Sequence, residues 1–139
     1  TITNNGIISG STGANGISVY ANGNIGTLTN SANGQINAGS GSPAILISGG
    51  TFSYPARIGT ITNLGTIHGI QVQSGGSVGT LNNAQNGLSY SGALPGNYNI
   101  IINSLTSYGS LVAISPSSTA FRTAQDGSDR CKQLLNLHL

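Results

Sequence analysis

Along most of the chain, apolar and polar positions alternate over short runs, and Gly, Asn or Ser follows each run. Residues 27–29 and 44–47 are two such runs, and β-branched side chains are frequent in them. Short runs of this kind between turn residues are typical of β-strands. Before residue 131 there is no apolar stripe with the 3.6-residue spacing of a helix. The chain is therefore predicted to be all-β up to its C-terminal tail.

The alternating pattern belongs to a longer repeat. Residues 58–69 read Ile-Gly-Thr-Ile-Thr-Asn-Leu-Gly-Thr-Ile-His-Gly, related copies begin at residues 25 and 78, and a truncated copy begins at residue 2. A period of about 20 to 33 residues with insertions is typical of a solenoid, in which each turn buries its apolar edge against the next. Three short strands per turn, stacked in parallel from turn to turn, predict a right-handed parallel β-helix of about three to four coils.

The repeats assign residues 1–91 to the β-helix, with coils at 2–24, 25–57, 58–77 and 78–91. Within each strand, inward-pointing apolar residues are expected to stack on their counterparts about 4.8 Å away in the next coil. The expected inward residues are Ile2, Leu28, Ile61 and Leu81 in the first strand; Ile7 or Ile8, Ile36, Ile67 and Leu88 in the second; and Ile17, Val19, Ile45, Ile47, Ile70 and Val72 in the third.

Residues 92–120 are predicted to form a capping hairpin over the last coil. A turn at 94–97 precedes an apolar strand at 98–103, and a second strand is expected at 110–114. Antiparallel pairing of these two strands would protect the open edge of the β-helix from other chains. Residues 121–139 are expected to be a disordered tail or a short helix, because glycine nearly vanishes there and charged residues appear.

Charged residues are scarce, which excludes several classes of function. The 139 residues include four Lys or Arg and two Asp or Glu, and Arg57 is the single charged residue before residue 121. Scattered cations cannot form a phosphate-binding patch, so nucleic acid is not an expected partner. The first carboxylate is Asp126, so the predicted β-helix lacks the clustered carboxylates of polysaccharide-active enzymes and of metal sites. We therefore expect no enzyme activity, cofactor, metal or small-molecule substrate.

An asparagine recurs at the same place in each repeat, and a structural role is predicted for it. Asparagine tolerates the left-handed backbone conformation of tight turns, and its amide can hydrogen-bond an equivalent amide one coil away. The expected asparagine ladder consists of Asn4, Asn30, Asn63 and Asn83.

Two features of the predicted outer surface are candidates for contact with a partner. The first is an outward Thr-x-Thr array, which resembles the ice-binding face of some β-helical antifreeze proteins, although threonine suits any exposed strand position. The second is the excursion at 51–57, where aromatic and Arg side chains can anchor a partner. The array consists of Thr27, Thr29, Thr60 and Thr62, and the loop side chains of interest are Phe52, Tyr54 and Arg57.

The repeat resembles a known family. Repeats of the form Ile-Gly-Thr-Ile-Thr-Asn-x-Gly-x-Ile-x-Gly look like those in passenger domains of bacterial type V autotransporters. Residues 95–111, which begin Pro-Gly-Asn-Tyr-Asn-Ile-Ile-Ile-Asn, resemble the autochaperone-like segment that closes such passengers ahead of their membrane barrel. The resemblance covers roughly residues 1–115. Because the sequence begins inside a repeat and carries no barrel strands, we expect it to be a fragment of such a protein.

The resemblance implies a β-helix that is displayed on the bacterial outer membrane or secreted, and that is exported with a C-terminal β-barrel. The implied role is that of a non-catalytic structural stalk or a virulence adhesin. Its partner would be a host cell, a neighbouring cell or a second copy of the chain. Two alternatives stay open: an ice-binding β-helix that uses the Thr-x-Thr array, and a degenerate polysaccharide-active β-helical enzyme.

Overall fold

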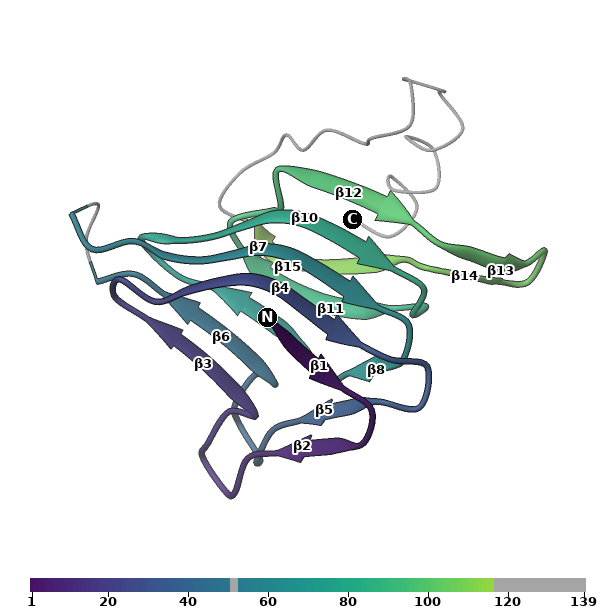
Figure 1. Cartoon of the computed structure of the whole chain (residues 1–139), viewed down its shortest axis with the longest axis horizontal. Helices are drawn as coiled ribbons and strands as arrows, with labels where there is room; N and C mark the ends of the chain where they lie inside the picture. The colour runs from purple at the N-terminus through teal and green to yellow at the C-terminus, as the bar shows by residue number, and fades with distance from the viewer. Residues whose placement is uncertain (51–52, 117–139) are drawn as a thin grey trace.

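The computed structural model describes residues 1–50 and 53–116, which form a parallel β-helix (Figure 1). These residues form strands, turns and loops and include no helix, so the predicted all-β fold class is confirmed. No helix that is long and apolar enough to span a bilayer occurs in the described part of the chain. The predicted tail at 121–139 and the last residues of the predicted cap, 117–120, lie outside the described residues.

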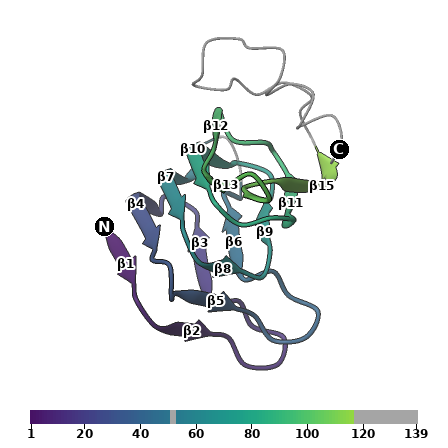
Figure 2. The ribbon, with the colours of Figure 1, turned by 90° about the vertical axis from the view of Figure 1, so that its right-hand side faces the viewer.

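Three sheets run along the solenoid, and successive coils add parallel strands to each (Figures 1 and 2). Sheet A contains β1 (Ile2–Asn4), β4 (Asn24–Asn30), β7 (Ala56–Asn63), β10 (Gly76–Asn83) and β12 (Asn97–Ile100), in that order. Sheet B contains β2 (Ile7–Ser9), β5 (Gln35–Asn37) and β8 (Thr66–Ile67). Sheet C contains β3 (Ile17–Tyr20), β6 (Ile45–Ser48), β9 (Ile70–Val72), β11 (Leu88–Gly92) and β15 (Leu111–Pro116).

The core is built from ranks of like residues, because strands of successive coils pair in register. In sheet A, Leu28 lies opposite Ile61, and Ile61 lies opposite Leu81. Successive members of a rank lie roughly 4.8 Å apart, which is the spacing of paired strands. Their burial removes apolar side chains from water, and this burial is the main stabilising term in a solenoid. The fully buried side chains of the three sheets include Leu28, Ile36, Ile45, Ile47, Ile58, Ile61, Leu81 and Leu88.

In the second strand of the first coil, the inward residue is Ile8 rather than Ile7. Ile8 pairs with Ile36, which in turn pairs with Ile67. Ile8 packs against the core, whereas Ile7 is 69% exposed.

The assignment of Leu88 to the second strand of the fourth coil was wrong. Leu88 begins β11 in sheet C, where it pairs with Leu111, and it does not stack on Ile67. The reason is chain length, because four residues, 84–87, join the end of β10 to the start of β11. That connection is too short for a turn, a strand and a second turn, so sheet B ends at β8 while sheets A and C each gain two further strands.

A C-terminal hairpin is present, but it is shorter than predicted. It consists of β13 (Ile102–Ser104) and β14 (Ser107–Tyr108), which pair antiparallel and project from the body (Figure 1). The predicted antiparallel pairing of residues 98–103 with 110–114 was wrong. Instead, β12 pairs parallel with β10, and β15 pairs parallel with β11. Parallel addition buries Tyr98 and Leu111 at the ends of existing inward ranks, so these two strands form one more coil.

Candidate contact surface and the asparagine ladder

The four predicted threonines lie together on the outer side of sheet A. Thr27 pairs with Thr60, and Thr29 pairs with Thr62, in the neighbouring strands β4 and β7. All four threonines are half-buried. Leu28 lies between the first two and Ile61 between the other two, and both are fully buried. Alternation along each strand therefore turns both members of each Thr-x-Thr unit outward. The next strands extend this array, so we define the threonine face as Thr27, Thr60, Thr80 and Asn97 in one rank and Thr29, Thr62, Asn82 and Asn99 in the other.

Hydrogen bonds tie the second rank of the threonine face together. Asn82 Nδ2 donates to Thr62 Oγ1 over 3.0 Å. Asn99 Nδ2 donates to Asn82 Oδ1 over 2.7 Å. The two asparagines replace threonine in the last two coils and connect three successive strands through side chains. These bonds hold the surface side chains in fixed positions relative to the sheet.

A rank of glycines borders the threonine face and lets successive coils approach closely. A Cβ atom on Gly59 would lie 2.6 Å from the carbonyl oxygen of Gly26, and one on Gly79 would lie 2.5 Å from that of Gly59. Real Cβ atoms essentially never come so close to a backbone oxygen, so this rank requires glycine. The Gly in the Ile-Gly-Thr unit of the repeat therefore reflects coil-to-coil spacing rather than turn conformation.

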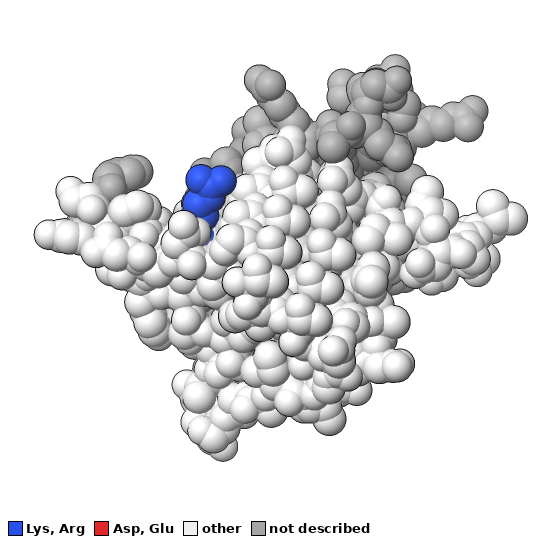
Figure 3. All heavy atoms as spheres, viewed as in Figure 1, with Lys and Arg blue, Asp and Glu red and all other residues white. Residues whose placement is uncertain are grey.

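Arg57 is the only charged side chain among residues 1–50 and 53–116, and it is exposed (Figure 3). It belongs to β7, where it pairs with Asn24 on one side and Ser77 on the other. One of its guanidinium nitrogens lies 3.4 Å from the position that a Cβ atom on Gly79 would take. The cation therefore extends over the glycine rank beside the threonine face.

The predicted contact loop is only partly described. Phe52 lies outside the described residues. Tyr54 is 54% exposed, and the following Pro55 accepts a backbone hydrogen bond from Asn22 over 2.9 Å. The sequence predicted Arg57 as part of this loop, whereas the structure places it in a strand. Tyr54 and Arg57 are both exposed and lie on either side of the buried Ala56.

The four predicted asparagines form a continuous hydrogen-bonded row inside the β-helix. Asn4 Nδ2 donates to Asn30 Oδ1 over 2.9 Å, and Asn30 Nδ2 donates to Asn63 Oδ1 over 2.9 Å. Asn63 Nδ2 then donates to Asn83 Oδ1 over 3.1 Å. All four side chains are buried, so each amide exchanges water for a neighbouring amide in a low-dielectric surrounding.

Asn4, Asn30 and Asn83 also bind backbone groups near the turn that follows their strand, whereas Asn63 binds the Gln85 side chain there. Asn30 Nδ2 lies 3.1 Å from both the Gly34 and the Thr66 carbonyl oxygens, and Asn4 makes the equivalent contacts to Gly6 and Gln35. The left-handed backbone conformation expected of these asparagines is not observed. The non-glycine residues with positive φ in the described ranges are Asn22 and Ser115. The asparagine is required for its side-chain amide, which joins one turn to the next.

At the end of the asparagine ladder, the Tyr98 hydroxyl accepts a hydrogen bond from the last asparagine, Asn83. In the fifth strand of sheet A, Ile100 occupies the position opposite Asn83 and offers no amide. Asn83 Nδ2 instead donates to the Tyr98 hydroxyl over 3.3 Å, and it also reaches the carbonyl oxygens of Gln85 and Ser110. Burial raises the pKa of Tyr98 to about 12, although the hydrogen bond from Asn83 lowers it in part. Burial also raises the pKa of Tyr90, whose hydroxyl donates to the Ala93 carbonyl over 3.1 Å.

Gln85 is a structurally important residue that sequence reasoning missed. Its Oε1 accepts a hydrogen bond from the Ile67 backbone N–H over 2.8 Å, and its Nε2 donates to the Ile67 carbonyl over 3.2 Å. The same Oε1 accepts from Asn63 Nδ2 over 2.9 Å. Gln85 thus occupies the place of the missing fourth strand of sheet B. The available signal was the four-residue connection between β10 and β11, which leaves Ile67 without a strand neighbour on the side away from β5.

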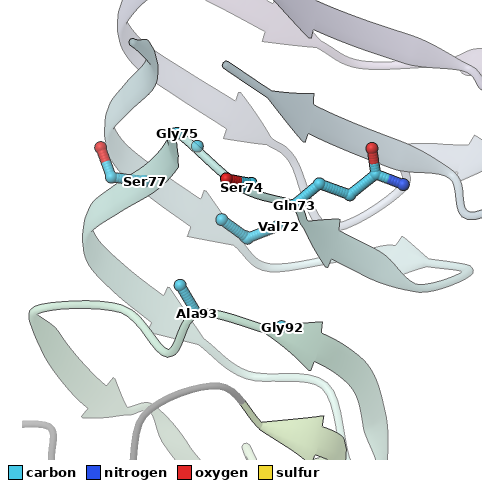
Figure 4. Close-up of a pocket in the computed structure, with 8 residues that line it drawn as sticks. Val72, Gln73, Ser74, Gly75, Ser77, Gly92 and Ala93 are labelled. Carbon is cyan, nitrogen blue, oxygen red and sulfur yellow. The ribbon is translucent and has the colours of Figure 1, made fainter. Parts of the chain in front are cut away.

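Two further surface features lie away from the threonine face and the asparagine ladder. A depression of about 590 Å³ lies beside the C-terminal ends of β9 and β11, where the side chains of Val72 and Ala93 point into it and those of Gln73 and Ser77 point away (Figure 4). His68 is exposed, and its backbone carbonyl binds Ala44. No group of three or more His, Cys, Asp or Glu side chains occurs within the described ranges.

Comparisons of the chain with protein families, with curated protein sequences and with solved structures found no match.

Proposed function

We propose that this chain is a non-catalytic part of an autotransporter passenger, displayed at the bacterial cell surface or secreted, where it serves as a structural stalk or adhesin. The repeat sequence and the closing segment resemble that family, and the fold is the parallel β-helix that the resemblance implies. The observation that carries the contact role is the threonine face, which presents two ranks of uncharged hydrogen-bonding side chains.

The chemistry of this face favours a neutral, extended partner. Its hydroxyl and amide groups recur at the spacing of strands in a sheet, about 4.8 Å, across the coils. They can both donate and accept hydrogen bonds, and Arg57 is the one charge beside them among the described residues. Binding through such groups depends on geometry, and salt should screen it little. An uncharged, extended segment on a host cell, on a neighbouring cell or in a second copy of the chain would meet these requirements.

Cell adhesion and cell–cell aggregation by bacteria that display the full chain test this proposal. The variant Thr62→Lys places a long cation in the centre of the threonine face, and it should reduce adhesion several-fold. Gln71→Lys is a matched control, because Gln71 is half-buried on the outer side of sheet C. Equal adhesion by both variants and the unchanged chain, with thermal unfolding unaltered, would refute a contact role for this face. Retained adhesion in Tyr54→Ala would separately exclude a contact role for the Tyr54 side chain of the loop.

A second candidate function is ice binding, and the observation that favours it is the register of the Thr-x-Thr units. Thr27 and Thr29 lie directly opposite Thr60 and Thr62, so the four threonines form two ranks across neighbouring strands. Thermal hysteresis of the purified chain would be the measurement. A hysteresis that is lost in Thr29→Tyr and Thr62→Tyr would support ice binding. Its absence in the unchanged chain would exclude this function.

A further inference from the structure

Sheet B ends at a strand edge that lies within the solenoid rather than at one of its ends. Sheets A and C continue for two strands beyond the third coil, whereas sheet B stops at β8. On one side, β8 pairs with β5. On its other side the backbone N–H and C=O of Ile67 face outward and need a partner. An edge of this kind is a template for pairing with another chain.

The Gln85 side chain satisfies both groups at this edge. A primary amide carries one carbonyl acceptor and N–H donors, so it reproduces the two contacts that a peptide unit of a neighbouring strand would make. The Ile67 N–H to Oε1 distance is 2.8 Å, and the Nε2 to Ile67 oxygen distance is 3.2 Å. Asn63 Nδ2 holds the same Oε1 over 2.9 Å and so fixes the orientation of the amide. Gln85 itself is half-buried.

We propose that Gln85 is a gate that closes the β8 edge against strand addition by a second copy of this chain. The occupant of the opened edge would be an extended segment of that copy, paired to the backbone N–H and C=O of Ile67. This goes beyond the proposed adhesive role, because it concerns sheet B and not the threonine face. It assigns Gln85 the task of limiting which surface the chain uses for self-association.

A second copy is the favoured occupant because its described residues bring no opposing charge to this edge. Among the described residues the single charged side chain is Arg57, in sheet A. Sheet B contains no charged residue at its edge, although charged side chains are the usual protection of exposed edges. Thr66 and Ile67 are both β-branched and suit a paired strand. The Gln85 amide is the group that binds both free backbone groups of β8, so its removal would leave them available to an identical chain.

The test compares the full chain with Gln85→Ala, which removes the amide, and with Gln85→Asn, which keeps it on a side chain one methylene shorter. Gln35→Ala is the matched control, because Gln35 is an exposed glutamine of sheet B whose side chain does not replace a strand. Sedimentation velocity measures association, and hydrogen exchange measures protection of the Ile67 amide. At low protein concentration the Ile67 amide should exchange about tenfold faster in both Gln85 variants. At high concentration it should slow again as dimers or larger assemblies form.

The Gln35 control and the unchanged chain should stay unaffected under the same conditions. Gln85 variants that fold, expose the Ile67 amide and remain monomeric at all concentrations would overturn the proposal. Association without concentration-dependent protection of Ile67 would overturn it too, because the copies would then be pairing elsewhere. If neither Gln85→Ala nor Gln85→Asn folds, Gln85 maintains the fold itself and is not a gate.

Discussion

Asn30 donates a hydrogen bond from Nδ2 to Oδ1 of Asn63 over 2.9 Å, although 33 residues separate the two in the sequence and neither is exposed to solvent. The bond crosses from one coil to the next at the turn between sheets A and B. Asn30 also binds the carbonyl oxygens of Gly34 and Thr66, and Asn63 also binds the side chains of Asn83 and Gln85, so each amide links successive coils. Removal of one amide therefore affects its neighbours in both directions.

The first prediction follows from this linkage. Asn63→Ala should lower the free energy of unfolding by about 2–4 kcal/mol, because it leaves the buried Asn30 amide and the Asn83 carbonyl each without one partner. Thermal and urea denaturation followed by circular dichroism would measure the loss. Asn33→Ala is the control, because Asn33 lies exposed at the same turn of the preceding coil. An unchanged melting temperature in Asn63→Ala would show that the row of amides does not stabilise the fold.

The second prediction concerns the inward rank of sheet B. Ile67 is 1% exposed and lies between Ile36 and the coils that follow, so Ile67→Asp would bury a carboxylate with no cationic partner. A loss of several kcal/mol, on the order of 3–5 kcal/mol, is expected, which would leave much of the chain unfolded at 37 °C. Ile7→Asp makes the same change at a residue that is 69% exposed, and it should shift the melting temperature little. Equal effects of the two substitutions would contradict the assignment of inward and outward faces.

The third prediction is a loss of stability at alkaline pH. Burial raises the pKa of Tyr98 from 10.0 to about 12 in the folded chain. Between those values the unfolded state has released the phenol proton and the folded state has not, so the free energy of unfolding falls as the pH rises. The stability that this group contributes is fully present below pH 10 and decreases by about 2 kcal/mol towards pH 12. Urea denaturation at a series of pH values from 8 to 12 would measure the slope.

The control for the alkaline transition is a set of Tyr→Phe variants. Tyr98→Phe removes the titrating group, so its free energy of unfolding should decrease less steeply above pH 10. Tyr90→Phe should act in the same direction, because burial raises the pKa of Tyr90 as well. Tyr20→Phe removes the hydroxyl of an exposed tyrosine and controls for the loss of a phenol as such. An identical slope in the unchanged chain, Tyr98→Phe and Tyr90→Phe would show that burial of these phenols does not set the alkaline limit.

The ranks of the first three coils were predictable because their pattern is local and repeated. Leu28 and Ile61 alternate with threonines, and alternation alone decides which side chain points inward. The outward placement of the Thr-x-Thr units followed from the same rule. Asn30 and Asn63 occupy equivalent positions of their repeats, which also indicated that they would meet, since a solenoid brings equivalent residues together.

The end of the solenoid was not predictable from the same signals. Tyr98 and Leu111 lie in apolar runs that suit a strand, but an apolar run does not specify which strand it pairs with. The pairing with β10 and β11 depends on burial at the ends of two existing ranks, which is a tertiary effect. Gln85 was missed for a related reason. Its side chain replaces a strand through contacts to Ile67, and no residue pattern marks a side chain that binds backbone 18 residues away.

The fourth prediction tests the glycine rank beside the threonine face. In Gly59→Ala, the new Cβ would lie 2.6 Å from the Gly26 carbonyl oxygen, so the coils must separate locally at a cost of about 1–3 kcal/mol. Gly26→Ala is the matched control, because nothing lies within 4 Å of its added Cβ and neither glycine has a positive φ. Thermal unfolding should therefore distinguish two identical substitutions in equivalent positions of adjacent coils. Equal melting temperatures would mean that coil spacing at this rank adapts freely, and that threonine-face geometry does not depend on glycine.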